Sequence, residues 1–219
     1  MLASSSYFSK SFAKQCEECG GHCCWSCHHL LQNKPNQFFC AECHKIQPPH
    51  CNNYFSMFQQ PQTFDIDKNS LEKRYRQYQS LVHPDHFFGK SSKELEYSDK
   101  VSECVNKGYE TLKNPQTRGE YILNLNHFHG SNDVPQDFLQ EILETHEKID
   151  ETTDINELSQ ILHQIEAKIS NEHKSLSESL KQTDKGLKDP KSASLSLSKL
   201  RYYGRIRETL REKLPASVL

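Results

Sequence analysis

Two amphipathic segments flank the tripeptide His83-Pro84-Asp85, and they constrain the fold more tightly than any other feature of the sequence. In each segment, apolar or aromatic side chains recur every three or four residues, which places them on one face of an α-helix. Pro84 cannot continue the first helix and disfavours a helical backbone at His83, so the chain must turn there. The two stripes are Leu71, Tyr75, Tyr78 and Val82, then Val101, Val105, Tyr109 and Leu112. We therefore expect two antiparallel helices whose connecting loop carries the tripeptide.

A helical hairpin with His-Pro-Asp in its loop resembles a J-domain, the module with which J-type co-chaperones stimulate the ATPase of Hsp70 chaperones. The resemblance implies that His83, Pro84 and Asp85 contact an Hsp70. The polar side of the first helix is basic and offers a surface to an acidic partner, although a run of charges can also be a merely solvated face. The basic residues assigned to the Hsp70 surface are Lys73, Arg74 and Arg76.

Four further features of this region lead to expectations about its local structure. Asp67 is a suitable N-cap for the first helix. The apolar cluster within Asn53–Phe58 is expected to pack under the two long helices. Gly108 lies in the second helix, where J-domains favour alanine, and glycine there costs about 1 kcal/mol. Cys104 lies in the second stripe and is expected to be a buried, small apolar residue.

Eight of the nine cysteines fall between Cys16 and Cys51, and their spacing indicates a metal site rather than a disulfide framework. Two Cys-x2-Cys pairs are separated by 12 residues. Each pair can place two thiolates on one turn, and two facing turns give the tetrahedral sulfur coordination of structural zinc sites. The predicted ligands of a structural Zn²⁺ are Cys24, Cys27, Cys40 and Cys43. Four protein ligands leave no open position for a water molecule, so this site would not be catalytic.

Other uses of the cysteines stay open. Cys16 and Cys19 form a third Cys-x2-Cys pair, with His22 and Cys23 close by, so one of these residues could replace a ligand. Redox-active thiol chemistry and scattered free thiols are the other interpretations.

The first 15 residues contain five serines, two lysines, three aromatic residues and no acidic residue. This composition is typical of a mitochondrial presequence, although arginine is absent, and a tail without a targeting role is the alternative. The remaining composition excludes other classes. A formal net charge of −2 argues against nucleic-acid binding by the whole chain, and no apolar run approaches the roughly 20 residues that a membrane span requires.

After a polar segment at 127–132, longer amphipathic patterns begin. The first includes Phe138, Ile142 and Ile149, and the last runs through Leu195, Leu200, Tyr203, Ile206 and Leu210. Between them, Asp154 and Glu157 form a capping-box pattern. This pattern precedes a nearly heptad seam of Ile155, Leu158, Leu162, Ile165, Ile169 and Leu176. Three amphipathic helices with short connections predict an antiparallel bundle, with dimerisation through the seam as the alternative.

The order of these parts, from Cys24 onward, resembles the HscB (Jac) family, the mitochondrial J-type co-chaperones of iron–sulfur cluster biogenesis. The resemblance rests on six short segments of the sequence: Cys24-Trp25-Ser26-Cys27, Phe38-Phe39-Cys40, Tyr54-Phe55-Ser56, Leu81-Val82-His83-Pro84-Asp85, Arg118-Gly119-Glu120-Tyr121 and Lys199-Leu200-Arg201-Tyr202. The resemblance implies a tether without enzymatic activity. Its J-domain would engage an Hsp70, and its bundle would hold the cluster scaffold protein to promote transfer to iron–sulfur recipient proteins.

The same resemblance places scaffold-binding residues on the first and last bundle helices: Leu139, Leu143, Glu144, Glu147 and Tyr202. Gln140 stands where the family often has a long apolar side chain. We thus expect an all-α protein with a presequence at 1–15, a zinc module at 16–50, a J-domain at 51–128 and a bundle at 133–215. Its expected location is the mitochondrial matrix, with a cytoplasmic pool left open. A general protein-folding co-chaperone and a thiol oxidoreductase are the alternative functions.

Overall fold

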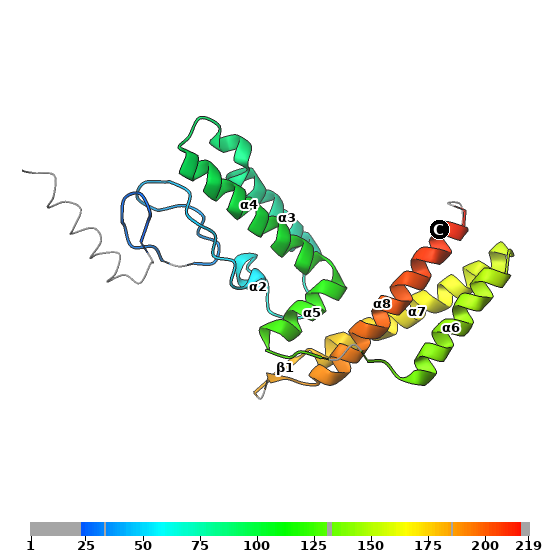
Figure 1. Cartoon of the computed structure of the whole chain (residues 1–219). Coiled ribbons are helices and arrows are strands. Elements are labelled where there is room, and N and C mark those ends of the chain that lie inside the picture. Colours follow the sequence, from blue (N-terminus) through cyan, green and yellow to red (C-terminus); the bar gives the residue numbers. More distant parts are fainter. Residues whose placement is uncertain (1–22, 33, 131–132, 185, 216–219) are drawn as a thin grey trace, which may run out of the picture. The chain divides into compact units, whose positions relative to one another are not determined.

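The computed structural model describes residues 23–32, 34–130, 133–184 and 186–215, and the expected presequence lies outside this part of the chain (Figure 1). The chain divides into two compact units. The first ends at Lys113 and the second begins at Asn114, except that Gln62–Ile66 also belongs to the second unit.

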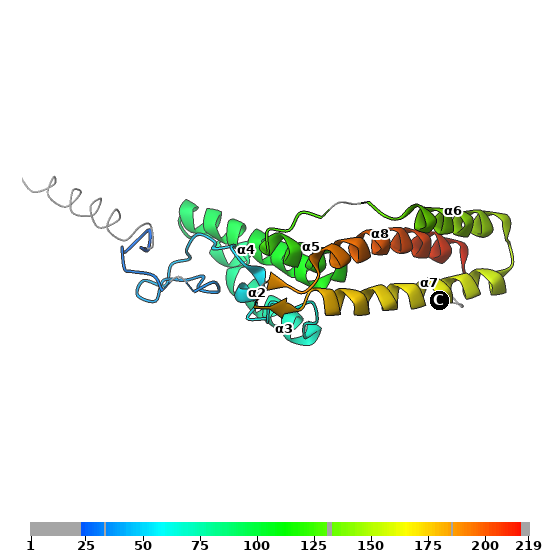
Figure 2. The same cartoon turned by 90° about the horizontal axis from the view of Figure 1, so that it is seen from below.

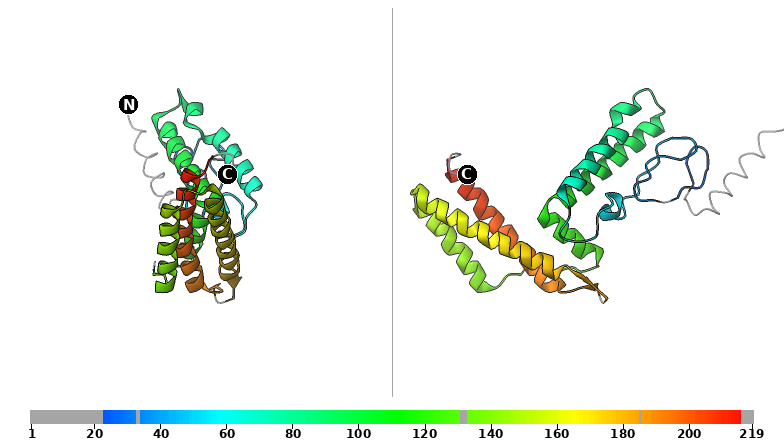
Figure 3. Two further views of the ribbon diagram at one scale, coloured as in Figure 1. Left: turned by 90° about the vertical axis from the view of Figure 1, so that its right-hand side faces the viewer. Right: turned by 180° about the vertical axis from the view of Figure 1, so that it is seen from behind.

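The first unit contains the helical hairpin that the periodicity predicts. Its elements are α2 (Tyr54–Met57), α3 (Lys68–Val82), the 3₁₀ helix η1 (Pro84–Phe87) and α4 (Ser92–Lys113). The Asp67 carboxylate accepts hydrogen bonds from the N–H groups of Asn69 and Ser70, which confirms the N-cap. Helices α3 and α4 run side by side, and the loop between them lies at one end of the hairpin (Figure 3).

Both predicted stripes line the core of this hairpin, with one difference. Tyr75 is half-buried and stacks on Tyr109 with ring centroids 4.0 Å apart. The other members are buried, namely Leu71, Tyr78, Val82, Val101, Val105, Tyr109 and Leu112. Helix α2 closes the core as expected, and it buries Tyr54, Phe55 and Met57.

Gly108 has a role that helix propensity does not predict. A Cβ at this position would lie 2.7 Å from Met57 Cε and 2.8 Å from Tyr54 Cδ1. Because these distances are shorter than real Cβ contacts, a side chain at position 108 would displace the Met57 and Tyr54 side chains of α2. The glycine therefore costs helix stability but permits the close approach of α2.

We expect Gly108→Val to lower the free energy of unfolding by about 1–3 kcal/mol, since overpacking displaces the α2 side chains. Lys107→Val is the matched control, because Lys107 is exposed on the same helix and the substitution introduces the same β-branched residue. Denaturant unfolding of both variants measures the difference. Equal stability of the two variants would contradict the packing role of Gly108.

Cys104 differs from its expected role. It is buried, as predicted, but it forms a disulfide with Cys51, which precedes α2. The Cα atoms are 6.2 Å apart, and the two cysteines lie 53 positions apart in sequence. Sequence spacing could not identify this pair because the fold alone brings Cys51 next to the middle of α4.

The second unit is a helical bundle with a small β-hairpin. Its helices are α5 (Pro115–Leu125), α6 (Gln136–Glu151), α7 (Ile155–Ser179) and α8 (Pro190–Lys213). The strands β1 (Gln182–Thr183) and β2 (Gly186–Leu187) pair in antiparallel fashion between α7 and α8. Helices α7 and α8 lie side by side along the unit (Figure 2).

Helix α5 packs against α8, so the compact units do not divide where the sequence places the end of the J-domain. The predicted J-domain at 51–128 includes α5, whereas this helix is part of the second unit. Gly119 on α5 allows this contact, because a Cβ there would lie 2.8 Å from Leu197 Cδ2.

The predicted apolar faces of α6, α7 and α8 largely form the bundle core, with three local differences. Ile155, at the start of the seam, is 47% exposed. On α8, Leu197 is buried while Leu195 is only half-buried. Asp154 caps α7 by accepting a hydrogen bond from Asn156 N–H, but Glu157 accepts one from the Thr152 hydroxyl, so the expected reciprocal capping box is not formed.

Among the described residues, no helix is both long and apolar enough to cross a membrane.

Candidate functional site

The two Cys-x2-Cys segments fold into matching turns. In the first, the N–H of His28 donates to the carbonyl of Cys24 over 3.0 Å, and in the second His44 donates to Cys40 over 3.1 Å. Both histidines have positive φ angles, 60° for His28 and 56° for His44. Each turn is closed by an isolated β-bridge. The bridges pair Cys23 with Leu30 and Phe39 with Ile46.

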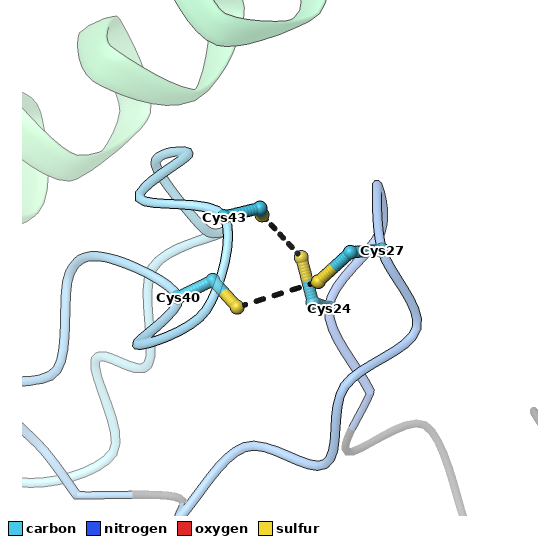
Figure 4. Close-up of side chains that lie close together, drawn as sticks. All are labelled: Cys24, Cys27, Cys40 and Cys43. Atoms are coloured by element: carbon cyan, nitrogen blue, oxygen red, sulfur yellow. Dashed lines mark hydrogen bonds between the residues drawn. The ribbon is translucent and has the colours of Figure 1, made fainter.

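The turns bring four sulfur atoms together (Figure 4). Cys24 Sγ lies 3.5 Å from Cys43 Sγ, Cys27 Sγ lies 3.6 Å from Cys40 Sγ, and all four atoms are within 4.8 Å of one another. A tetrahedral ion with zinc–sulfur bonds of about 2.3 Å would separate its sulfur ligands by roughly 3.8 Å. These cysteines therefore form a cluster that could hold a metal ion.

The thiols of the cluster differ in how readily they ionise. Burial opposes ionisation of Cys24, but hydrogen bonds from backbone N–H groups and from the other thiols outweigh it and lower the pKa of Cys24 to about 6. For Cys43, burial is the largest cause and neighbouring thiols add to it, so its pKa rises to about 12. The buried Gln47 amide donates to Cys24 Sγ over 3.3 Å. Four thiolates this close together need a positive ion between them.

Of the alternative metal ligands, the structure describes only Cys23. Cys16, Cys19 and His22 lie outside the described residues. Cys23 takes part in a disulfide, so its sulfur does not join the cluster. Gln47 could not be identified from the sequence, because an amide four residues after Cys43 carries no recognisable metal-site signal.

The His83 loop presents its side chains to solvent. His83 is the C-cap residue of α3, and its Nδ1 accepts a hydrogen bond from Asp85 N–H over 3.3 Å. The side chains of His83 and Asp85 are 49% and 78% exposed. Pro84 begins η1, and Phe87 anchors this short helix in the core. The next residue, Phe88, is 84% exposed and was not singled out by the sequence patterns.

The basic residues of α3 differ in their surroundings. Lys73 and Arg76 are exposed, and Arg76 forms an ion pair of 2.5 Å with Glu72. Arg74 is half-buried and donates to the side chain of Gln59. Arg76 and Arg74 thus already have acceptors within the chain, while Lys73 projects into solvent.

The residues assigned to scaffold binding lie on α6 and α8 of the second unit. Leu139 and Leu143 are 41% and 53% exposed, while Phe138, Ile142 and Ile149 supply the buried face of α6. Glu144 and Glu147 are also exposed. Tyr202 is half-buried, and its ring meets Phe138 edge-on with centroids 5.7 Å apart. Tyr202 and the α6 leucines therefore belong to the same pair of packed helices.

Known proteins resemble this chain over most of its length. A family model described as the HSCB C-terminal oligomerisation domain matches residues 134–211. The mouse iron–sulfur cluster co-chaperone protein HscB is 34% identical over 222 residues, covering 96% of this chain and 87% of the mouse protein. The human protein of the same name is 33% identical, covering 88% of this chain and 83% of its own.

The solved structures agree with the sequence matches. The crystal structure of human co-chaperone protein HscB superposes with a TM-score of 0.80 at 32% identity, covering 87% of this chain and 98% of the human chain. These similarities define the class of protein, a non-enzymatic co-chaperone. The chain belongs to the HscB family of iron–sulfur cluster co-chaperones.

Proposed function

We propose that this chain tethers an iron–sulfur cluster scaffold protein to an Hsp70 and stimulates ATP hydrolysis by that Hsp70. The observation that carries the proposal is the exposed His83-Pro84-Asp85 loop at the end of a helical hairpin, in a chain of the HscB family. The bundle would hold the scaffold through α6 and α8. Hydrolysis in the Hsp70 would then promote cluster transfer to iron–sulfur recipient proteins.

A pull-down with the intact chain tests this assignment. We expect the chain to capture an Hsp70 in an ATP-dependent manner and a folded iron–sulfur scaffold protein in a separate, ATP-independent contact. A general protein-folding co-chaperone would instead prefer unfolded polypeptides over the folded scaffold. Preferential capture of denatured clients in competition with the scaffold would overturn the proposal.

The thiol oxidoreductase alternative has little support. A redox-active Cys-x2-Cys pair needs two cysteines that can react as an isolated couple. In this chain, both pairs converge on one four-sulfur cluster, as a metal site requires. The family is also non-enzymatic.

We further propose that Cys24, Cys27, Cys40 and Cys43 bind a structural Zn²⁺. An all-sulfur, four-residue donor set in two facing turns is the arrangement that zinc favours. The ion would supply no catalytic step, since its four positions would be filled by protein. It would instead hold the two turns together, because ligand binding and local folding are coupled in such sites.

Cys24→Ser or Cys40→Ser should release the zinc and loosen the module while α3 to α8 stay folded. Metal analysis after gel filtration under reducing conditions measures the loss, and circular dichroism checks the helices. Cys51→Ser is the control, because Cys51 lies outside the sulfur cluster. Full zinc content in both cluster variants would refute this ligand set, and so would a wild-type chain without metal.

Two further expectations concern assembly and location. The match to an oligomerisation domain supports a homodimer formed through the bundle, which sedimentation at several concentrations would detect. The composition of residues 1–15 supports import into the mitochondrial matrix, while the existence of a cytoplasmic pool stays open. Fusion of these residues to a reporter protein tests the import.

A further inference from the structure

Trp25 connects the sulfur cluster to the helical hairpin within the first unit. It lies between the clustered residues Cys24 and Cys27, and its indole N–H donates to the carbonyl of Ile46 over 2.6 Å. Its ring meets Tyr97 edge-on, with centroids 5.8 Å apart. Lys93 Nζ lies 4.7 Å from the centre of the same ring. The side chain thus has one edge fixed by the metal module and its face in contact with α4.

Trp25 contacts the N-terminal end of α4. Lys93 and Tyr97 belong to the first two turns of this helix, which begins at Ser92, a few residues after η1. The helix also packs against η1, the short helix that contains Pro84 and Asp85. Any displacement of the first turns of α4 would therefore reach the His83 loop.

A second link joins the module to the N-terminal cap of α4. Ser91 and Glu94 form a capping box, in which Ser91 N–H donates to Glu94 Oε2 over 3.3 Å and Glu94 N–H donates to Ser91 Oγ over 3.4 Å. The Ser91 hydroxyl is the main cause that lowers the pKa of Glu94, and the positive charge of Lys45 contributes. Lys45 itself lies 5.1 Å from the Trp25 ring centre. The charge of Lys45 and the contacts of the Trp25 ring therefore both act on the first turn or two of α4.

We propose that Trp25 is a positioning residue that couples metal binding in the four-cysteine module to the order of the His83 loop. With the metal bound, the Cys24–Cys27 turn would hold the Trp25 ring against Lys93 and Tyr97, and the ring would hold the first turns of α4. The inference rests on the proposed Hsp70 role of the loop and adds a site of control to it.

The expected size of the effect follows from the contacts. An edge-to-face aromatic pair and a cation–π contact at a partly exposed site together favour the docked state by about tenfold. Loss of the metal should then raise hydrogen exchange in residues 84–99 by about the same factor, while the buried middle of α4 stays protected.

Trp25 is the only tryptophan of the chain, so its fluorescence reports directly on the docked state. The experiment uses the full chain, first loaded with Zn²⁺, then treated with a chelator, then reloaded with Zn²⁺ alone. We expect chelation to move the emission to longer wavelength and to raise exchange across residues 84–99 about tenfold, and Zn²⁺ to reverse both changes.

Variants on the α4 side separate coupling from simple unfolding of the module. Lys93→Ala combined with Tyr97→Ala should keep the zinc but show raised exchange at 84–99 even in the loaded state. Lys107→Ala, an exposed position further along α4, should behave as wild type. In Hsp70 assays Trp25→Ala should weaken stimulation, and the conservative Trp25→Phe should restore part of it.

Unchanged exchange at residues 84–99 on metal removal would overturn the coupling, as would a uniform rise over all of α3 and α4. Neither fluorescence nor exchange requires an Hsp70. A failure of the coupling is therefore distinguishable from a failure of the proposed function, which normal stimulation by a His83 variant would reveal.

Discussion

His83→Gln should abolish stimulation of the Hsp70 ATPase and leave the fold intact. The side chain is 49% exposed at the end of α3, so its replacement should change the free energy of unfolding by no more than about 0.5–1 kcal/mol. Its imidazole Nδ1 accepts a hydrogen bond from the Asp85 N–H, and this bond shapes the exposed surface of the loop. Steady-state ATP hydrolysis by the Hsp70, titrated with each purified variant, measures the effect.

His86→Gln is the matched control for this substitution. His86 is exposed in the same loop, with its ring centroid 6.3 Å from that of His83, but it lies outside the tripeptide. We expect the control to stimulate close to wild type. If His83→Gln also stimulates normally, the J-domain assignment is wrong. If both variants fail, the loop matters as a whole and the tripeptide has no special role.

Leu139→Ala, Leu143→Ala and Tyr202→Ala, combined in one variant, should weaken scaffold binding by orders of magnitude. The two leucines expose 41% and 53% of their surface on α6, and Tyr202 on α8 contacts the α6 residue Phe138. Interface energy is usually concentrated in a few apolar anchors, each costing roughly 1–4 kcal/mol when truncated. Calorimetric titration with the scaffold protein measures the loss.

Basal stimulation of the Hsp70 without scaffold should survive in this triple variant, because that activity belongs to the His83 loop. Ile155→Ala is a suitable control, since Ile155 is a 47% exposed apolar residue of the same bundle outside the proposed surface. Differential scanning calorimetry distinguishes surface from core. A large drop in the melting temperature of the triple variant would show that the substitutions damage the bundle interior.

The acidic residues beside this surface make a separate contribution. Glu144 and Glu147 are exposed on α6, and Glu144 accepts a hydrogen bond from Gln140 over 3.0 Å. Exposed charges at the rim of an interface mainly affect the association rate and its salt dependence. Their replacement by glutamine should therefore slow association at low salt more than it speeds dissociation.

Features with a local cause could be predicted from the sequence alone. Apolar periodicity identified the helices on both sides of His83, because a helix face is set by residues three and four apart. Asp67 and Asp154 could be recognised as N-caps since a cap bonds to backbone groups two or three residues away. The four clustered cysteines were identified because each turn needs only a Cys-x2-Cys segment.

Only the tertiary structure decided what joins distant parts of the chain. It pairs Cys51 with Cys104, packs α5 against α8, and explains Gly108 by the approach of α2. It also places Trp25 on the first turns of α4. None of these contacts leaves a periodic or short-range signal, because each depends on which helix faces meet when the core is packed. The sequence determined which segments are helices and which turns can hold a metal ion, whereas long-range packing decided which of them touch.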